Sequence, residues 1–110
     1  MPESHALAPR FAALGDPTRL AIVQRLLDAG EQPAGQLRDL ADISAPALSR
    51  HLKVLREAGL VTRRTDAQRR LYSVRPEAMR AISDWAISYR AFWSGSFDRL
   101  DAAIRDRGLS

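Results

Sequence analysis

The chain contains no cysteine among its 110 residues. This absence excludes disulfide bonds, thiolate metal sites and thiol-based redox sensing, so a regulatory switch has to use other chemistry. Histidine is also scarce, because only His5 and His51 are present and they lie far apart in sequence. We therefore expect no metal site and no cofactor.

Long apolar runs are missing as well. Residues 1–5 contain no apolar signal-peptide core, and no stretch is long enough to span a bilayer. These features predict a cytoplasmic protein with no membrane partner. The chain also lacks a glycine-rich phosphate loop and a Ser-His-Asp spacing beyond what chance supplies, so an enzyme is not expected.

The length of 110 residues fits one compact domain. A domain of this size buries a limited fraction of its surface, so a second subunit is expected to supply part of the core. We expect a flexible N-terminus over residues 1–6 and a disordered tail over residues 105–110.

Residues 44–60 predict a capped helix with one apolar and one basic face. Ser44 can cap the first free backbone N–H groups, Pro46 is tolerated in the first turn, and Gly59 can adopt the left-handed conformation that ends a helix. The apolar face carries residues at steps of four and three: Leu48, Leu52 and Leu55. The outer face carries Ser49, Arg50, Lys53 and Arg56. A helix that reads bases in DNA needs this combination.

Two helices are expected upstream. Residues 7–14 predict a short helix with Pro9 in its first turn and Gly15 as its stop. The next helix begins after Asp16, a typical N-cap residue, and ends at Gly30.

A shorter helix is expected over residues 34–41, followed by a tight turn at residues 42–43. Two helices joined so briefly are typical of a helix-turn-helix, here residues 34–58. In that motif the first helix supports the second, which enters the major groove.

Residues 60–74 predict a β-hairpin wing with a polar turn at residues 66–68. Positive charge is concentrated here: residues 50–75 carry a net charge of +6, whereas the whole chain carries +4. The rest of the chain is therefore slightly acidic, and a polyanion should be attracted to this surface specifically.

Five of the seven aromatic residues fall between positions 85 and 97. With their apolar neighbours they keep steps of three or four through one long helix expected over residues 76–105. This stripe can be an ordinary buried face against residues 7–14, a subunit interface, or a ligand pocket lined by Trp85, Tyr89 and Trp93. We favour the interface, because Trp and Tyr are enriched in such surfaces.

Residues 14–20, residues 49–61 and the pair Arg63-Arg64 with Tyr72 resemble, in this order and spacing, the ArsR family of bacterial winged helix-turn-helix repressors. The resemblance covers about residues 7–104. It implies a mainly α (α+β) fold of about five helices and a two-stranded wing, in a homodimer formed by the first and last helices.

The aromatic segment is similar to a branch of that family that lacks metal-sensing motifs and whose genes often neighbour those for START-like proteins that bind hydrophobic ligands. The family's thiolate motif would fall near residues 33–36, where this chain has no cysteine. Metal sensing is therefore not expected.

The resemblance implies a DNA-binding repressor that acts as a homodimer on an inverted-repeat operator in double-stranded DNA. Arg50 is the candidate for a bidentate contact to guanine. The DNA-binding candidates are Ser44, Ala45, Ala47, Ser49, Arg50, Lys53, Arg56, Arg63, Arg64, Gln68, Arg69 and Arg70. The dimer-interface candidates are Leu7, Phe11, Leu14, Ile82, Trp85, Tyr89, Phe92, Trp93, Phe97 and Leu100.

Two alternatives stay open. One is a winged-helix adaptor that binds proteins only, because the fold alone does not dictate function. The other is a repressor induced by a small hydrophobic ligand at the aromatic last helix. The sequence does not identify an effector, an operator or the regulated genes.

Overall fold

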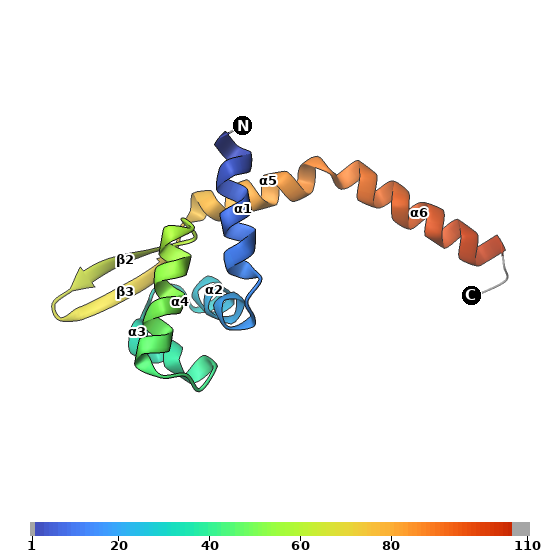
Figure 1. Cartoon of the computed structure of the whole chain (residues 1–110). Coiled ribbons are helices and arrows are strands. Elements are labelled where there is room, and N and C mark those ends of the chain that lie inside the picture. Colours follow the sequence, from blue (N-terminus) through green and yellow to red (C-terminus); the bar gives the residue numbers. More distant parts are fainter. Residues whose placement is uncertain (1, 107–110) are drawn as a thin grey trace.

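A computed structural model describes residues 2–106, with side chains for residues 6–92 and 94–106. The wing projects from one end of the molecule and the last helix from the other (Figure 1). The elements follow in this order: α1 (Pro2–Leu14), α2 (Pro17–Ala29), β1 (Gln32–Pro33), α3 (Ala34–Leu37), a 3-10 turn η1 (Arg38–Leu40), α4 (Ala45–Glu57), β2 (Val61–Asp66), β3 (Arg69–Val74), α5 (Pro76–Ser88) and α6 (Arg90–Asp106). This arrangement is a winged helix-turn-helix.

The core lies between α2, α4 and the base of the wing. The predicted apolar stripe of α4 is confirmed, because Leu48, Leu52 and Leu55 are all buried. They pack in one cluster with these residues: Ala13, Ile22, Val23, Leu26, Leu37, Leu60, Val61, Tyr72 and Ala78. Burial of this stripe turns the opposite face of α4 toward solvent.

The predicted start of α2 and both predicted ends of α4 are confirmed. The Asp16 carboxylate accepts a hydrogen bond of 3.0 Å from the backbone N–H of Arg19 and caps α2. The Ser44 hydroxyl accepts one of 3.2 Å from the backbone N–H of Ala47 and caps α4. Gly59 has a φ of +78°, the left-handed conformation expected after α4.

The sheet has three strands in the order β1-β3-β2, not the two that were expected. The hairpin of β2 and β3 is confirmed, with its turn at residues 67–68. The extra strand β1 pairs Gln32 with Tyr72 and Pro33 with Leu71. A strand of two residues has no periodicity of its own, so only its pairing with β3 reveals it.

Two predictions in the first half of the chain are wrong at the helix ends. Helix α1 begins at Pro2, so residues 2–6 are helical and Pro9 lies inside the helix instead of in its first turn. The helix expected over residues 34–41 is instead the one-turn α3 followed by the 3-10 turn η1. Met1 and residues 107–110 lie outside the described part of the chain.

The single helix expected over residues 76–105 is also wrong, because α5 ends at Ser88 and α6 begins at Arg90 (Figure 1). The Ser88 hydroxyl donates a hydrogen bond of 2.7 Å to the carbonyl of Trp85, and the Tyr89 N–H bonds the Ala86 carbonyl in a tighter turn. Apolar spacing continues across this break, so periodicity alone did not reveal it. Within residues 2–106, no helix combines the length and apolar character that crossing a membrane requires.

Burial in the core predicts how much stability is lost when a side chain of α4 is shortened. Leu52 is 2% exposed, so Leu52→Ala should lower the free energy of unfolding by about 2–5 kcal/mol through lost burial and a residual cavity. Val54→Ala is the control on the same helix, because Val54 is 38% exposed. Urea unfolding followed by circular dichroism measures both, and equal losses would contradict the assigned core face.

Candidate nucleic-acid interface

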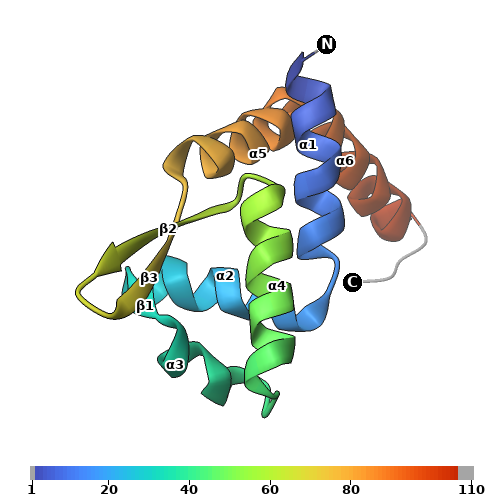
Figure 2. The same cartoon turned by 60° about the vertical axis from the view of Figure 1, so that its left-hand side comes forward.

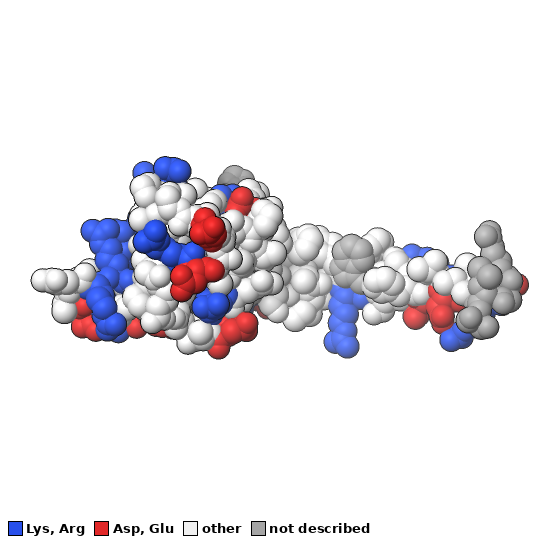
Figure 3. Space-filling view, turned by 90° about the horizontal axis from the view of Figure 1, so that it is seen from below, with Lys and Arg blue, Asp and Glu red and all other residues white. Residues whose placement is uncertain are grey.

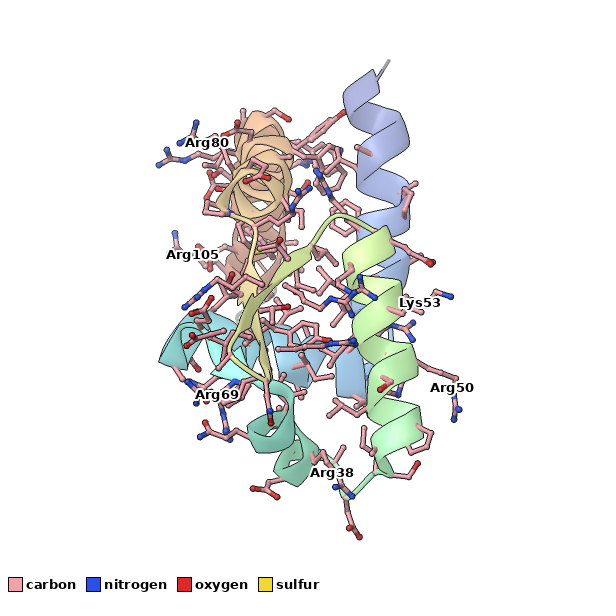
Figure 4. The ribbon with its side chains drawn as sticks, turned by 90° about the vertical axis from the view of Figure 1, so that its left-hand side faces the viewer. Arg38, Arg50, Lys53, Arg69, Arg80 and Arg105 are labelled. Atoms are coloured by element: carbon pink, nitrogen blue, oxygen red, sulfur yellow. The ribbon has the colours of Figure 1, made fainter. Side chains whose placement is uncertain are left out.

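The outer face of α4 presents polar side chains to solvent. Ser49, Arg50 and Lys53 are exposed, and Arg50 and Lys53 point away from the body of the protein (Figure 4). At the start of the helix Ser44 and Ala45 are exposed and Ala47 is half-buried. The structure therefore brings the predicted base-reading residues together on one face of a helix that its other face anchors in the core.

One side chain of α1 holds the C-terminal end of α4. The Arg10 guanidinium donates a hydrogen bond of 3.3 Å from Nε to the carbonyl of Ala58. A cation at this position also interacts favourably with the carbonyl end of the helix dipole. Helices α1 and α4 lie side by side in two views (Figures 1 and 2).

A second polar cluster links the start of α2 to the middle of α4. Arg19 donates from Nε to the Ala13 carbonyl at 2.8 Å, and its NH1 lies 3.4 Å from Nδ1 of His51. The same His51 nitrogen lies 3.9 Å from the Asp16 carboxylate. The hydrogen bond from the backbone N–H of Arg19 lowers the pKa of Asp16, and this keeps the carboxylate ionised beside the Arg19 guanidinium and the His51 ring. His51 therefore faces the chain's own helices and not the outer face of α4.

The wing carries the other predicted DNA-binding residues. All five of them are exposed: Arg63, Arg64, Gln68, Arg69 and Arg70. Basic side chains gather toward the wing end of the molecule, and acidic side chains lie beside them and toward the centre of the same face (Figure 3). This face therefore carries both signs of charge.

Arg64 is paired in the free protein. Its Nε and NH2 donate to the two carboxylate oxygens of Glu31, both at 2.8 Å. These hydrogen bonds lower the pKa of the Glu31 carboxyl and raise the pKa of Arg64. Glu31 lies 33 residues earlier in the chain, so sequence reasoning did not assign it to this surface.

Two further basic residues have weaker partners. Lys53 Nζ lies 3.9 Å from the Glu57 carboxylate, and Arg69 lies 3.5 Å from Asp66. Both pairs are exposed, so solvent screens the charges and each pair contributes little to the stability of the protein. Arg50 has no ion pair with the described side chains of residues 6–92 and 94–106, so its guanidinium is available to a ligand.

Arg56 differs from the other bases of α4. Its side chain is half-buried, and its Nε is buried with no hydrogen-bond partner in the described part of the chain. The sequence placed it on or beside the outer face. In the structure it lies next to the wing, because it lines a surface pocket with Val61, Thr62 and Arg63 of β2.

The dimer candidates divide into two groups. Leu14 and Ile82 pack against the chain's own core, and Leu7 is half-buried. The others described are at least 39% exposed: Phe11, Trp85, Tyr89, Phe92, Phe97 and Leu100. The side chain of Trp93 lies outside the described residues.

Aromatic contacts join α1 to α5 within the chain. Phe11 and Trp85 meet edge to face with ring centres 5.4 Å apart, and Trp85 lies 5.4 Å from Tyr89. Part of the stripe therefore does pack on the chain's own first helix. Trp85 also borders a surface pocket of about 360 Å3 with Leu7 and Arg80, but Tyr89 does not line it.

No group of three or more His, Asp or Glu side chains able to hold a metal ion occurs among the described side chains of residues 6–92 and 94–106. Cysteine is absent from the whole sequence.

A family model described as a helix-turn-helix domain matches residues 14–64. The chain is 41% identical over 75 residues to the HTH-type transcriptional regulator YgaV of Escherichia coli, covering 68% of this chain and 76% of that protein. It is 34% identical over 97 residues to the arsenical resistance operon repressor of Escherichia coli, covering 87% and 80%. A crystal structure of an ArsR family transcriptional regulator matches with a TM-score of 0.72 at 25% identity, covering 83% of this chain and 93% of that one.

The chain belongs to the ArsR family. This ArsR-family protein is a DNA-binding transcriptional regulator and not an enzyme. The resemblance read from the sequence is thereby confirmed, and so is its winged helix-turn-helix fold.

The Arg64–Glu31 pair predicts an effect on DNA affinity. Glu31→Gln removes a negative charge beside the wing and frees Arg64, so affinity for random duplex DNA should rise about two- to fivefold at low salt. Asp28→Asn on α2 is the control, since it changes the net charge equally. Fluorescence anisotropy measures both, and an equal rise in the two variants would contradict a role for the pair.

Proposed function

We propose that this ArsR-family protein is a homodimeric transcriptional repressor that binds an inverted-repeat operator. The observation that carries the proposal is the geometry of α4: its apolar face is buried, both its ends are capped, and Ser49, Arg50 and Lys53 stand exposed on the outer face. A two-fold dimer would place two such helices in successive major grooves on one side of the duplex. Occupancy of the operator would then block transcription.

Each side chain has a role in this proposal. Arg50 contacts guanine through its two-pronged guanidinium, and Ser49 makes a short hydrogen bond to a base. Lys53 and Arg56 contact backbone phosphates, while the exposed N-terminal residues Ser44 and Ala45, with the half-buried Ala47, approach the groove. The wing residues Arg63, Arg64, Gln68, Arg69 and Arg70 contact phosphates or the minor groove.

The apolar surface of α5 and α6 supports the homodimer. Helix α6 projects from the body, and its Phe97 and Leu100 are 66% and 57% exposed (Figure 1). Phe11, Trp85 and Tyr89 are also at least 39% exposed, and exposed large apolar side chains often mark an interaction surface. We assign it to a second copy of the chain that contributes the same surface.

The absence of cysteine limits which effectors the protein can bind. With no cysteine, this protein cannot use the thiolate metal site of its family's resistance regulators. We propose that its response does not involve thiolate-bound metal.

Arg50→Ala tests the assignment of α4. The operator is first located by footprinting the DNA upstream of the protein's own gene. Loss of the guanine contact should then cost about 1–3 kcal/mol on the operator and relax one base position. Arg25→Ala on the exposed side of α2 is the control for charge, and anisotropy titrations measure both variants.

Equal losses on operator and random DNA for Arg50→Ala would contradict base readout by this residue. A wild-type affinity that changes little between about 50 mM and 200 mM salt would instead favour the adaptor function, because phosphate contacts make binding steeply salt-dependent.

Phe97→Asp tests the exposed apolar surface of α6. If this surface lies in the dimer interface, a buried carboxylate should weaken dimerisation by at least about 100-fold while the helical content stays unchanged. Ala102→Asp is the control, since Ala102 is exposed and lies on the opposite face of α6. Analytical ultracentrifugation reads out the result, and equal dimerisation of both variants would exclude Phe97 from the interface.

A further inference from the structure

Three arginines from three parts of the chain surround one pocket at the base of the wing. The pocket has a volume of about 340 Å3 and is lined by Arg56 of α4, Val61, Thr62 and Arg63 of β2, and Arg75 before α5. The end of α4, the start of β2 and the start of α5 lie together in two views (Figures 1 and 2). Only the folded chain brings these residues to one place.

Arg56 is the innermost of the three. Its Nε is buried and has no hydrogen-bond partner in the described part of the chain. A buried donor on a charged group costs free energy when it lacks an acceptor. Such a group in a native fold usually calls for an explanation, such as a bound water, an ion or a functional role. The Arg56 side chain, which lines the pocket, therefore has a donor without an acceptor in the free protein.

The charges of the pocket favour an anion. Among the side chains of residues 6–92 and 94–106, neither Arg56 nor Arg63 has an ion pair, while Arg75 Nε lies 3.6 Å from the Glu77 carboxylate. That pair is exposed, with side chains 46% and 64% accessible, so a stronger anion can displace it at small cost. Guanidinium groups match the oxygen geometry of phosphate, and three of them around one pocket select for it.

We propose that Arg56, Arg63 and Arg75 form a binding site for a phosphate group. Arg56 lies two helical turns after Ser49, at the wing side of the exposed face of α4. The geometry therefore favours a backbone phosphate of bound DNA, and a soluble phosphate compound is the other source of the same chemistry. The DNA assignment rests on the proposed operator binding, whereas the pocket does not. Arg75 was not among the sequence-based DNA candidates.

The first experiment uses the protein alone. Thermal unfolding is followed in inorganic phosphate and in chloride of equal ionic strength, for the wild type and for Arg75→Gln, Arg56→Gln and the control Arg25→Gln. At phosphate about tenfold above its dissociation constant, the wild type and the control should gain roughly 6 °C. Arg75→Gln should lose most of this gain. Because the Arg75 side chain is exposed, the substitution should leave the fold intact, so a smaller gain reports lost phosphate binding.

The second experiment uses the operator. Single backbone phosphates are replaced one at a time by neutral methylphosphonates, and the affinity of each duplex is measured. One position in each half-site should weaken wild-type binding by about tenfold but leave Arg75→Gln unaffected. The same variant should also reduce the salt dependence by about one released ion per subunit, beyond the effect of Arg25→Gln.

The outcomes separate the sources. A phosphate position coupled to Arg75 assigns the site to DNA, and stabilisation by free phosphate without any such position assigns it to a soluble phosphate compound. Phosphate that stabilises Arg56→Gln and Arg75→Gln as strongly as the wild type overturns the proposal. If the wild type fails to distinguish the inverted repeat from random DNA, the proposed function fails, but the unfolding experiment still tests the pocket.

Discussion

Burial of one face of α4 is the constraint on which the rest of the structure depends. Leu48, Leu52 and Leu55 are 0–3% exposed and pack with α2 and the base of the wing. A helix has one orientation that buries such a stripe, so the opposite face, with Ser49 and Arg50, must point to solvent. The direction in which the protein presents the groups proposed to read bases is therefore a consequence of apolar packing.

Polar contacts also hold α4 in place. Arg10 binds the C-terminal end of α4, and Arg19 and Asp16 meet His51 at its middle. These bonds join α1, which carries part of the proposed dimer surface, to the helix proposed to read DNA. In a dimer, the separation of the two α4 helices would depend on such links, because each half-site has a fixed position along the duplex.

Much of this could be predicted from the sequence because it depends on neighbours along the chain. Ser44, Asp16 and Gly59 specify helix ends through bonds and backbone angles within a few residues, and the hairpin follows from two β-prone runs around a short turn. The helix of residues 76–105 was predicted wrongly for the same reason. Apolar spacing continues through Tyr89, and the bond from Ser88 that accompanies the break leaves no periodic signal.

The sequence by itself determined the fold class, the basic helix and wing, and the lack of thiolate chemistry, since these depend on local periodicity, capping and composition. Only the tertiary structure decided which charges meet. Glu31 neutralises Arg64 across 33 positions, and Arg56, Arg63 and Arg75 converge on one pocket from three elements. Electrostatic interactions depend on distance in space, and a linear count of charges does not contain that distance.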